Sequence, residues 1–187
     1  MSRILARFPG LGMVRGWIEA GEAAGKVREN LLRALYAARL PVEGRGLLVH
    51  AASVRGPDGS AWLFPGKSGA GKSTLAGLAS DTAWRAIAED VSIVTWPGPR
   101  VSGTLPPGSG EPLGALGFLE HAPVQRAERL SRTASLRRLL ECAVWFGSDG
   151  AVGAILDQAV RLVSAVPCYR LGFRPDVSVW PFLEGVA

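Results

Sequence analysis

A nine-residue stretch at positions 66–74, GKSGAGKST, carries the residue types that bind a nucleoside triphosphate. It matches the pattern G-x-x-x-x-G-K-[ST] at every fixed position. Glycine lets successive backbone N–H groups point at phosphate oxygens, the lysine reaches the β- and γ-phosphates, and the following hydroxyl binds Mg²⁺. Ser73 is therefore expected to be a metal ligand as well as a nucleotide contact. We expect the nucleotide to be contacted by Gly66, Ser68, Gly69, Ala70, Gly71, Lys72, Ser73 and Thr74.

The segments on either side of this loop fit the motif. An apolar run at 61–64 predicts a strand, and residues 75–79 continue as an apolar segment compatible with a helix. A second apolar strand is predicted at 46–54, and residues 55–60, rich in Gly, Pro and Asp, predict a turn between the two strands. A β-hairpin is therefore expected to lead directly into the phosphate-binding loop.

Two adjacent carboxylates, Glu89 and Asp90, follow the loop at a spacing that favours a role in phosphoryl transfer. Such a reaction needs one group that holds Mg²⁺ and one that orients or deprotonates the acceptor. A single helix after Lys72 would return the next strand beside the loop strand and place both carboxylates near the terminal phosphate. The alternative is a surface acidic pair at a strand edge.

His50 lies in the first strand of the predicted hairpin. A lone histidine in an apolar strand is more often a satisfied core residue than a catalytic one. The hairpin, however, also brings this strand beside the loop strand, where the ring would lie next to the phosphates. The spacing alone favours neither role.

The rest of the chain predicts further helices and strands around this centre. Apolar residues recur at helical spacing over 22–40, and Pro41 and Gly44 are expected to end that helix. The helix is expected to pack on the sheet, with docking to a partner as the alternative. The other predicted elements are strands at 91–94, 113–119 and 168–173, helices at 131–147 and 149–166, a Gly/Pro-rich connection at 97–114 and a C-terminal tail at 175–183.

The composition is that of a globular protein. Hydrophobic residues at 48% and charged residues at 20% exclude wholesale disorder, and we expect a helical extension at 1–44 followed by one domain at 45–187. No apolar run approaches the ~18–20 residues of a membrane span, so no membrane partner is expected. The net charge of +5 comes from arginine without a basic run, which favours a solvated surface over nucleic-acid binding. Cys142 and Cys168 lie in apolar contexts that indicate buried thiols and a cytoplasmic location.

These residues together resemble the HPr kinase/phosphorylase family and its shorter bacterial relatives, some of which phosphorylate ribosomal peptides such as lasso peptides. The resemblance lies in a strand with His50, a hairpin, a second strand, the GKSGAGKST loop and Ala88-Glu89-Asp90. It implies an α/β fold with a P-loop kinase core of the HPr kinase / phosphoenolpyruvate carboxykinase type, having a mixed sheet, a hairpin entry and flanking helices. It also implies transfer of phosphate from ATP, with Mg²⁺, to a serine hydroxyl of a peptide or protein.

The resemblance also assigns roles. His50 corresponds to the family's histidine just before the hairpin, and Glu89 and Asp90 correspond to its paired aspartates. Asp90 is then the acid/base that orients the acceptor, next to Lys72 at the phosphates, and Glu89 is a metal-side carboxylate, with these two roles open to exchange. The chain departs from the family in its glutamate at the first acidic position and in lacking a recognisable glycine-rich signature after the pair.

Three further side chains are hypotheses for the substrate site. Arg170 and Arg174 lie in or just after the last predicted strand and would hold the transferring phosphate, because guanidinium groups pair well with phosphate. Thr104 in the long connection would touch the acceptor or the nucleotide. Two other functions would use the same nucleotide residues: a kinase for a small hydroxyl-bearing molecule, and a nucleotide-binding regulatory protein without transfer activity.

Overall fold

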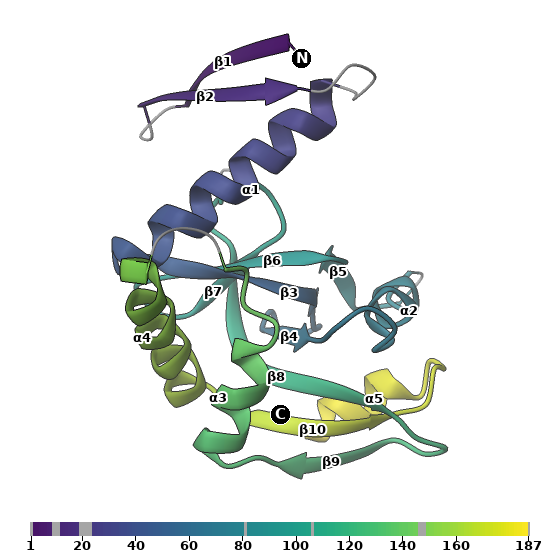
Figure 1. Ribbon diagram of the computed structural model, residues 1–187. Helices are drawn as coiled ribbons and strands as arrows, with labels where there is room; N and C mark the ends of the chain where they lie inside the picture. The colour runs from purple at the N-terminus through teal and green to yellow at the C-terminus, as the bar shows by residue number, and fades with distance from the viewer. Residues whose placement is uncertain are drawn as a thin grey trace.

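The computed structural model of the chain describes residues 2–8, 12–18, 24–80, 82–105, 107–145 and 149–186. Within these residues, eight strands form one mixed sheet and two more form a separate antiparallel hairpin (Figure 1). The hairpin consists of β1 (Ser2–Phe8) and β2 (Gly12–Ile18). The mixed sheet consists of β3 (Gly46–Arg55), β4 (Ala61–Pro65), β5 (Arg85–Ala88), β6 (Val91–Thr95), β7 (Arg100–Ser102), β8 (Glu111–His121), β9 (Arg126–Arg129) and β10 (Cys168–Phe173).

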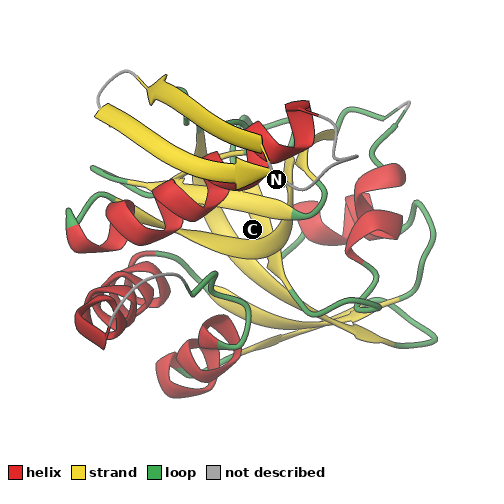
Figure 2. Ribbon diagram, turned by 45° about the horizontal axis from the view of Figure 1, so that its top comes forward, coloured by secondary structure: helices red, strands yellow, loops and turns green. Residues whose placement is uncertain are grey.

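Helices lie along the outside of the mixed sheet, as Figure 2 shows. The helices of the described residues are α1 (Ala24–Val42), α2 (Lys72–Gly77), α3 (Arg132–Leu140), α4 (Asp149–Ala165) and α5 (Val179–Glu184). The expectation of an α/β fold with a mixed sheet and flanking helices is therefore confirmed. None of these helices is long and apolar enough to cross a lipid bilayer.

β3 is the central strand of the packing because its side chains alternate between two apolar clusters. Leu47 and Val49 belong to the cluster formed with α3 and α4. Leu48 packs on the other face, against α1, together with Ile93 of β6. His50 follows Leu48 by two residues and therefore projects toward the face that α1 covers.

The N-terminal region is only partly helical. The hairpin β1–β2 was not predicted, and α1 begins after it; the predicted helix start at Glu22 lies outside the described residues. Pro41 does not end the helix, because it lies buried in the last turn, where its missing N–H removes only one hydrogen bond. Gly44, with a φ of +66°, follows the helix as expected and donates its N–H to the Pro41 carbonyl at 3.0 Å. α1 packs on the sheet, which was the first of the two alternatives for this helix.

The segment after Ser131 also differs from its prediction. α3 ends at Leu140, whereas a helix to Gly147 was expected, a position outside the described residues. The chain instead pairs with β3, since the Val144 N–H donates to the Leu48 carbonyl at 2.9 Å. Strand pairing therefore replaces the last turns of the predicted helix. β7, β9 and α5 likewise occupy segments for which no regular element was predicted.

Cys142 and Cys168 are buried free thiols, as the sequence indicated. Burial is the largest cause that raises the pKa of each thiol above its ordinary value. Neither side chain is exposed enough to act as a surface nucleophile. We assign both to packing in the cluster that α3 and α4 form with the sheet.

Candidate active site

The phosphate-binding loop leaves the end of β4 and closes where α2 begins at Lys72. Gly69 and Gly71 have φ values of +83° and +95°, in the left-handed region that favours glycine. A Cβ on Gly71 would lie 3.2 Å from the ring of Phe173, and a Cβ on Gly66 would lie 2.9 Å from Cβ of Ala70. The glycines of the motif are therefore required by the backbone path and by close packing.

Lys72 is buried, with 6% of its surface exposed, and its ammonium group lies inside the loop. Its Nζ donates to the carbonyls of Gly66 at 2.6 Å and Lys67 at 2.8 Å, and lies 3.3 Å from Nε2 of His50. Burial lowers the pKa of Lys72, while the nearby Asp90 carboxylate acts in the opposite direction. The lysine is thus held at the position where the motif requires a cation.

His50 connects this lysine to the acidic pair. Its backbone carbonyl accepts from the Gly66 N–H at 3.2 Å, which ties β3 to the loop, and its Nδ1 lies 3.2 Å from Oδ1 of Asp90. A lysine ammonium only donates, so Nε2 must accept and Nδ1 must carry the proton that Asp90 receives as a hydrogen bond. One neutral tautomer of His50 therefore satisfies both contacts.

Asp90 reaches this position because β5 and β6, which are consecutive in the chain, both pair antiparallel with β3. Ala88 lies opposite Ser53 and Val91 lies opposite His50, so the two acidic residues fill the positions between these pairs. The Asp90 carbonyl also accepts from the N–H of Ala51 at 3.0 Å. The expected route was wrong in one respect: the strand that carries the pair lies beside β3, not beside the loop strand β4, which pairs with β3 and β8.

Arg33 of α1 holds the other side of Asp90 and was not predicted. Its Nη1 lies 3.3 Å from Oδ2 of Asp90, and its Nη2 lies 2.7 Å from Oε1 of Glu29. The spacing of Glu29 and Arg33 indicates an ion pair on one helix face, but nothing in the sequence connects either residue to Asp90. Helix α1, which was expected to belong to an N-terminal extension of the domain, therefore contributes a side chain to the site.

A cavity of about 340 Å³ lies over the loop and gathers most of the predicted site residues. Its lining consists of His50, Ser68, Gly69, Gly71, Lys72, Ser73, Thr74, Glu89, Asp90 and His121. His121 is the one member not predicted for the site; its Nε2 lies 3.1 Å from the Gly69 carbonyl. His121 pairs with Phe173 where β8 lies beside β10, and the Phe173 ring packs against Gly71 of the loop. This places His121 at the loop, although no sequence motif marks the contact.

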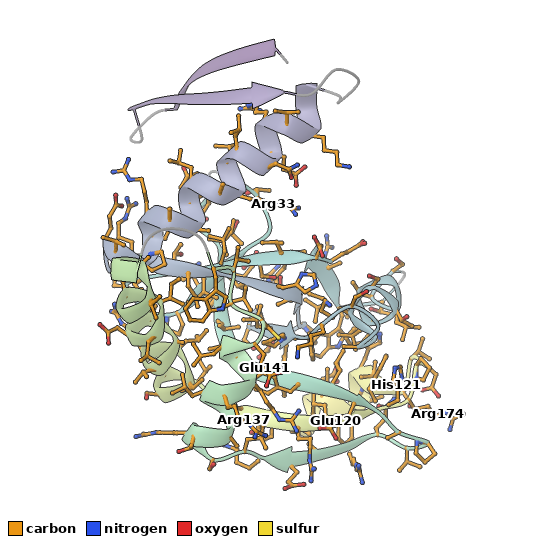
Figure 3. The ribbon with its side chains drawn as sticks, viewed as in Figure 1. Arg33, Glu120, His121, Arg137, Glu141 and Arg174 are labelled. Atoms are coloured by element: carbon orange, nitrogen blue, oxygen red, sulfur yellow. The ribbon has the colours of Figure 1, made fainter. Side chains whose placement is uncertain are left out.

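Three predicted substrate residues lie outside this cavity. Arg170 forms an ion pair with Glu128 of β9. Arg174 follows β10 and its Nε lies 2.6 Å from Oδ2 of Asp176; Figure 3 shows it at the same end of the sheet as His121, whereas Arg33 lies on α1. Thr104 lines a second cavity, between α1 and the residues that follow β7.

The donor set near the loop fits a nucleotide-bound Mg²⁺ better than a metal caged by the protein alone. Among the described residues, no group of three or more His, Cys, Asp or Glu side chains is placed to hold a metal ion. Mg²⁺ commonly takes one or two carboxylates together with substrate phosphates and water. The exposed Ser73 hydroxyl and the Glu89 carboxylate, both in the cavity lining, are the side chains suited to that role.

No family model matches the chain, and no curated protein matches it significantly.

Proposed function

We propose that this protein is a cytoplasmic kinase that uses ATP and Mg²⁺ to phosphorylate a serine hydroxyl of a peptide or protein. The observation that carries the proposal is the chain of contacts from Lys72 Nζ through His50 to Asp90, at the mouth of the glycine-rich loop. Phosphoryl transfer needs a phosphate grip and a group that orients the acceptor, and this arrangement supplies both. The β3–β4 hairpin that enters the loop supports a core of the HPr kinase / phosphoenolpyruvate carboxykinase type, as the resemblance implies.

The proposed reaction is a single displacement at the γ-phosphorus. The serine Oγ forms a bond to phosphorus while the bond to the β–γ bridging oxygen breaks, and ADP leaves with that oxygen. The serine proton passes to the carboxylate of Asp90, whose orientation is fixed by His50 on one oxygen and Arg33 on the other. The Lys72 ammonium neutralises charge on the phosphates in a site partly removed from water.

Glu89 is suited to the metal side of the site. It lines the cavity beside Asp90 and, unlike Asp90, it has no ion pair or hydrogen bond with another described residue. Ser73 and Glu89 would hold the Mg²⁺ that accompanies ATP, which supplies positive charge to the β- and γ-phosphates. This division of roles assigns the metal to Glu89 and the acceptor to Asp90.

The test is incubation of the purified chain with ATP, Mg²⁺ and a library of serine-containing peptides, followed by mass spectrometry. We expect phosphoserine to form in step with ADP, and we expect Lys72→Met to abolish both. Calorimetry with a non-hydrolysable ATP analogue measures nucleotide binding separately. Tight nucleotide binding without phosphate on any serine would overturn the kinase proposal and leave a nucleotide-binding protein.

A further inference from the structure

A second cavity, of about 350 Å³, lies between the N-terminal half of α1 and the chain that runs through β6 and the residues after β7. The buried residues Leu32 and Ile93 belong to its lining, and so does Thr104. Arg28 and Arg33 of α1 contribute the positive charges. We refer to this cavity as the α1 groove.

The α1 groove adjoins the phosphate cavity at one ion pair. Arg33 lines the groove, and Asp90, whose Oδ2 lies 3.3 Å from Nη1 of Arg33, lines the phosphate cavity. A molecule in the groove that passes this pair therefore arrives at the carboxylate proposed to receive the acceptor proton. The groove is placed to hold the part of an acceptor that surrounds the reacting hydroxyl.

The wall opposite α1 is fixed by close packing. A Cβ on Gly103 would lie 2.1 Å from the Ile87 carbonyl oxygen, so only glycine allows this part of the chain to approach β5. Leu105 packs into the apolar cluster that α1 forms with Leu48 and Ile93. The groove is thus held open by the folded core, which lowers the cost of ordering a bound segment.

The charges of the α1 groove favour an anionic ligand. The lining of this groove carries two arginines and one glutamate, so positive charge is in excess, and Arg33 lies 2.7 Å from Glu29 and 3.3 Å from Asp90. The Arg28 side chain is exposed, and its guanidinium group has no ion pair or hydrogen bond with another described residue. A guanidinium group in this position is suited to a carboxylate, which it can bind through two parallel hydrogen bonds.

The spacing of the two arginines sets the geometry of that ligand. Arg28 and Arg33 are five residues apart on one helix, which corresponds to about 7.5 Å along its axis. An extended peptide covers this distance with about two to three residues at roughly 3.3 Å each. Because Arg33 reaches Asp90, we expect a carboxylate on Arg28 and a hydroxyl at Asp90 to come from side chains about two or three residues apart in one extended peptide segment.

We propose that the α1 groove binds the acceptor as an extended peptide segment, with an acidic side chain two or three residues from the acceptor serine seated on Arg28. This proposal rests on the proposed kinase function and adds a sequence preference to it. Thr104 then lies beside the peptide rather than the nucleotide.

The test uses two serine peptides that differ only in having aspartate or lysine at a given distance from the serine, with the distance varied one position at a time. For the wild-type chain we expect the aspartate peptide to be preferred at two or three residues. Arg28→Glu should raise its KM by about tenfold or more, with kcat little changed, and should shift the preference toward the lysine peptide. Lys26→Glu is the matched control: it reverses a charge on the same helix, outside the groove, and should change neither value.

A fluorescent aspartate peptide, bound in the presence of a non-hydrolysable ATP analogue, separates this proposal from the kinase proposal. Loss of binding in Arg28→Glu but not in Lys26→Glu supports the groove assignment. Equal binding by both variants and the wild type overturns it, whether or not phosphate is transferred. Efficient transfer to serine peptides without any acidic preference, or to free serine as well as to peptides, also overturns it while leaving the kinase proposal intact.

Discussion

Nδ1 of His50 lies 3.2 Å from Oδ1 of Asp90, and the other ring nitrogen of the same histidine lies 3.3 Å from the ammonium of Lys72. This relationship joins the phosphate-binding loop to the acidic pair through one side chain on the central strand. It makes His50 a positioning residue, since it fixes the Asp90 carboxylate and the lysine without having to contact the acceptor itself.

Replacing His50 by glutamine should reduce phosphoryl transfer by about 10²-fold, because Asp90 loses one of its two orienting partners. Nucleotide affinity should change little, since the loop keeps its own contacts to Lys72. His121→Gln is the matched control, because the ring of this second histidine of the cavity forms its hydrogen bond with the Gly69 carbonyl and not with Asp90 or Lys72. Steady-state rates and nucleotide titrations check both variants; an equal loss of transfer in both would contradict the role given to His50.

Gly71→Ala should destabilise the fold by about 1–3 kcal/mol, because alanine is strained at a φ of +95°. It should also weaken nucleotide binding, since the new Cβ lies 3.2 Å from the Phe173 ring and the loop must shift. Gly77→Ala is the matched control in α2: its Cβ meets no atom within 4 Å, and it should stabilise by about 0.5–1 kcal/mol. Urea denaturation of both variants gives the two free energies, and a neutral Gly71→Ala would contradict the loop geometry.

Lys72 provides a prediction with a defined pH dependence. Burial lowers its pKa below the ordinary 10.5, so between the two values the unfolded chain binds more protons and the stability of the fold rises with pH. At neutral pH the buried ammonium is therefore a cost, which Lys72→Met removes. We expect the variant without nucleotide to be as stable as the wild type or more so, within about 1 kcal/mol, and to show no rise in Tm when ATP is added.

The stability difference between Lys72→Met and the wild type should shrink as pH rises toward 10.5. Lys26→Met, which replaces an exposed lysine on α1, should show neither this trend nor a loss of the ATP effect. Thermal unfolding curves over a pH series measure both. A variant that is much less stable than the wild type at neutral pH would contradict the assignment of Lys72 to binding rather than folding.

The C-terminal helix α5 should contribute strongly to stability through Trp180. This side chain is buried, stacks on Trp84 with ring centroids 4.9 Å apart, and donates its indole N–H to the Leu78 carbonyl at 2.9 Å. Trp180→Ala should therefore cost about 3–5 kcal/mol. Trp145→Ala, at a tryptophan that is 46% exposed, should cost far less in the same urea titration. Similar losses in the two variants would contradict the contribution given to the Trp180 contacts with Trp84 and Leu78.

The sequence was sufficient to predict the loop and the elements nearest to it. The G-x-x-x-x-G-K-[ST] spacing carries its own structural requirement, and the runs at 46–54 and 61–64 differ clearly from the turn that joins them, so β3, β4 and α2 could be assigned. Local signals failed where tertiary contacts decide. The chain after Leu140 pairs with β3 although its apolar spacing is helical.

In the candidate site, too, local sequence patterns were informative and tertiary contacts could not be predicted. The spacing after Lys72 indicated that Asp90 would lie near the loop, but the strand that brings it there was misplaced, because pairing partners are not encoded in local spacing. Arg33 and His121 were missed for a related reason. Arg33 meets Asp90 across 57 positions and His121 meets Gly69 across 52, and no local pattern marks either contact.

The most direct test of the central claim is a paired measurement on Asp90→Asn: the rate of γ-phosphoryl transfer to a serine peptide and the affinity for ATP. Asparagine keeps the size of the side chain but removes its ability to accept the serine proton. The proposed function predicts a loss of transfer of about 10²–10⁴-fold with nucleotide binding retained. An unchanged transfer rate in a variant that still binds ATP would contradict it, because Asp90 would then have no part in the chemistry.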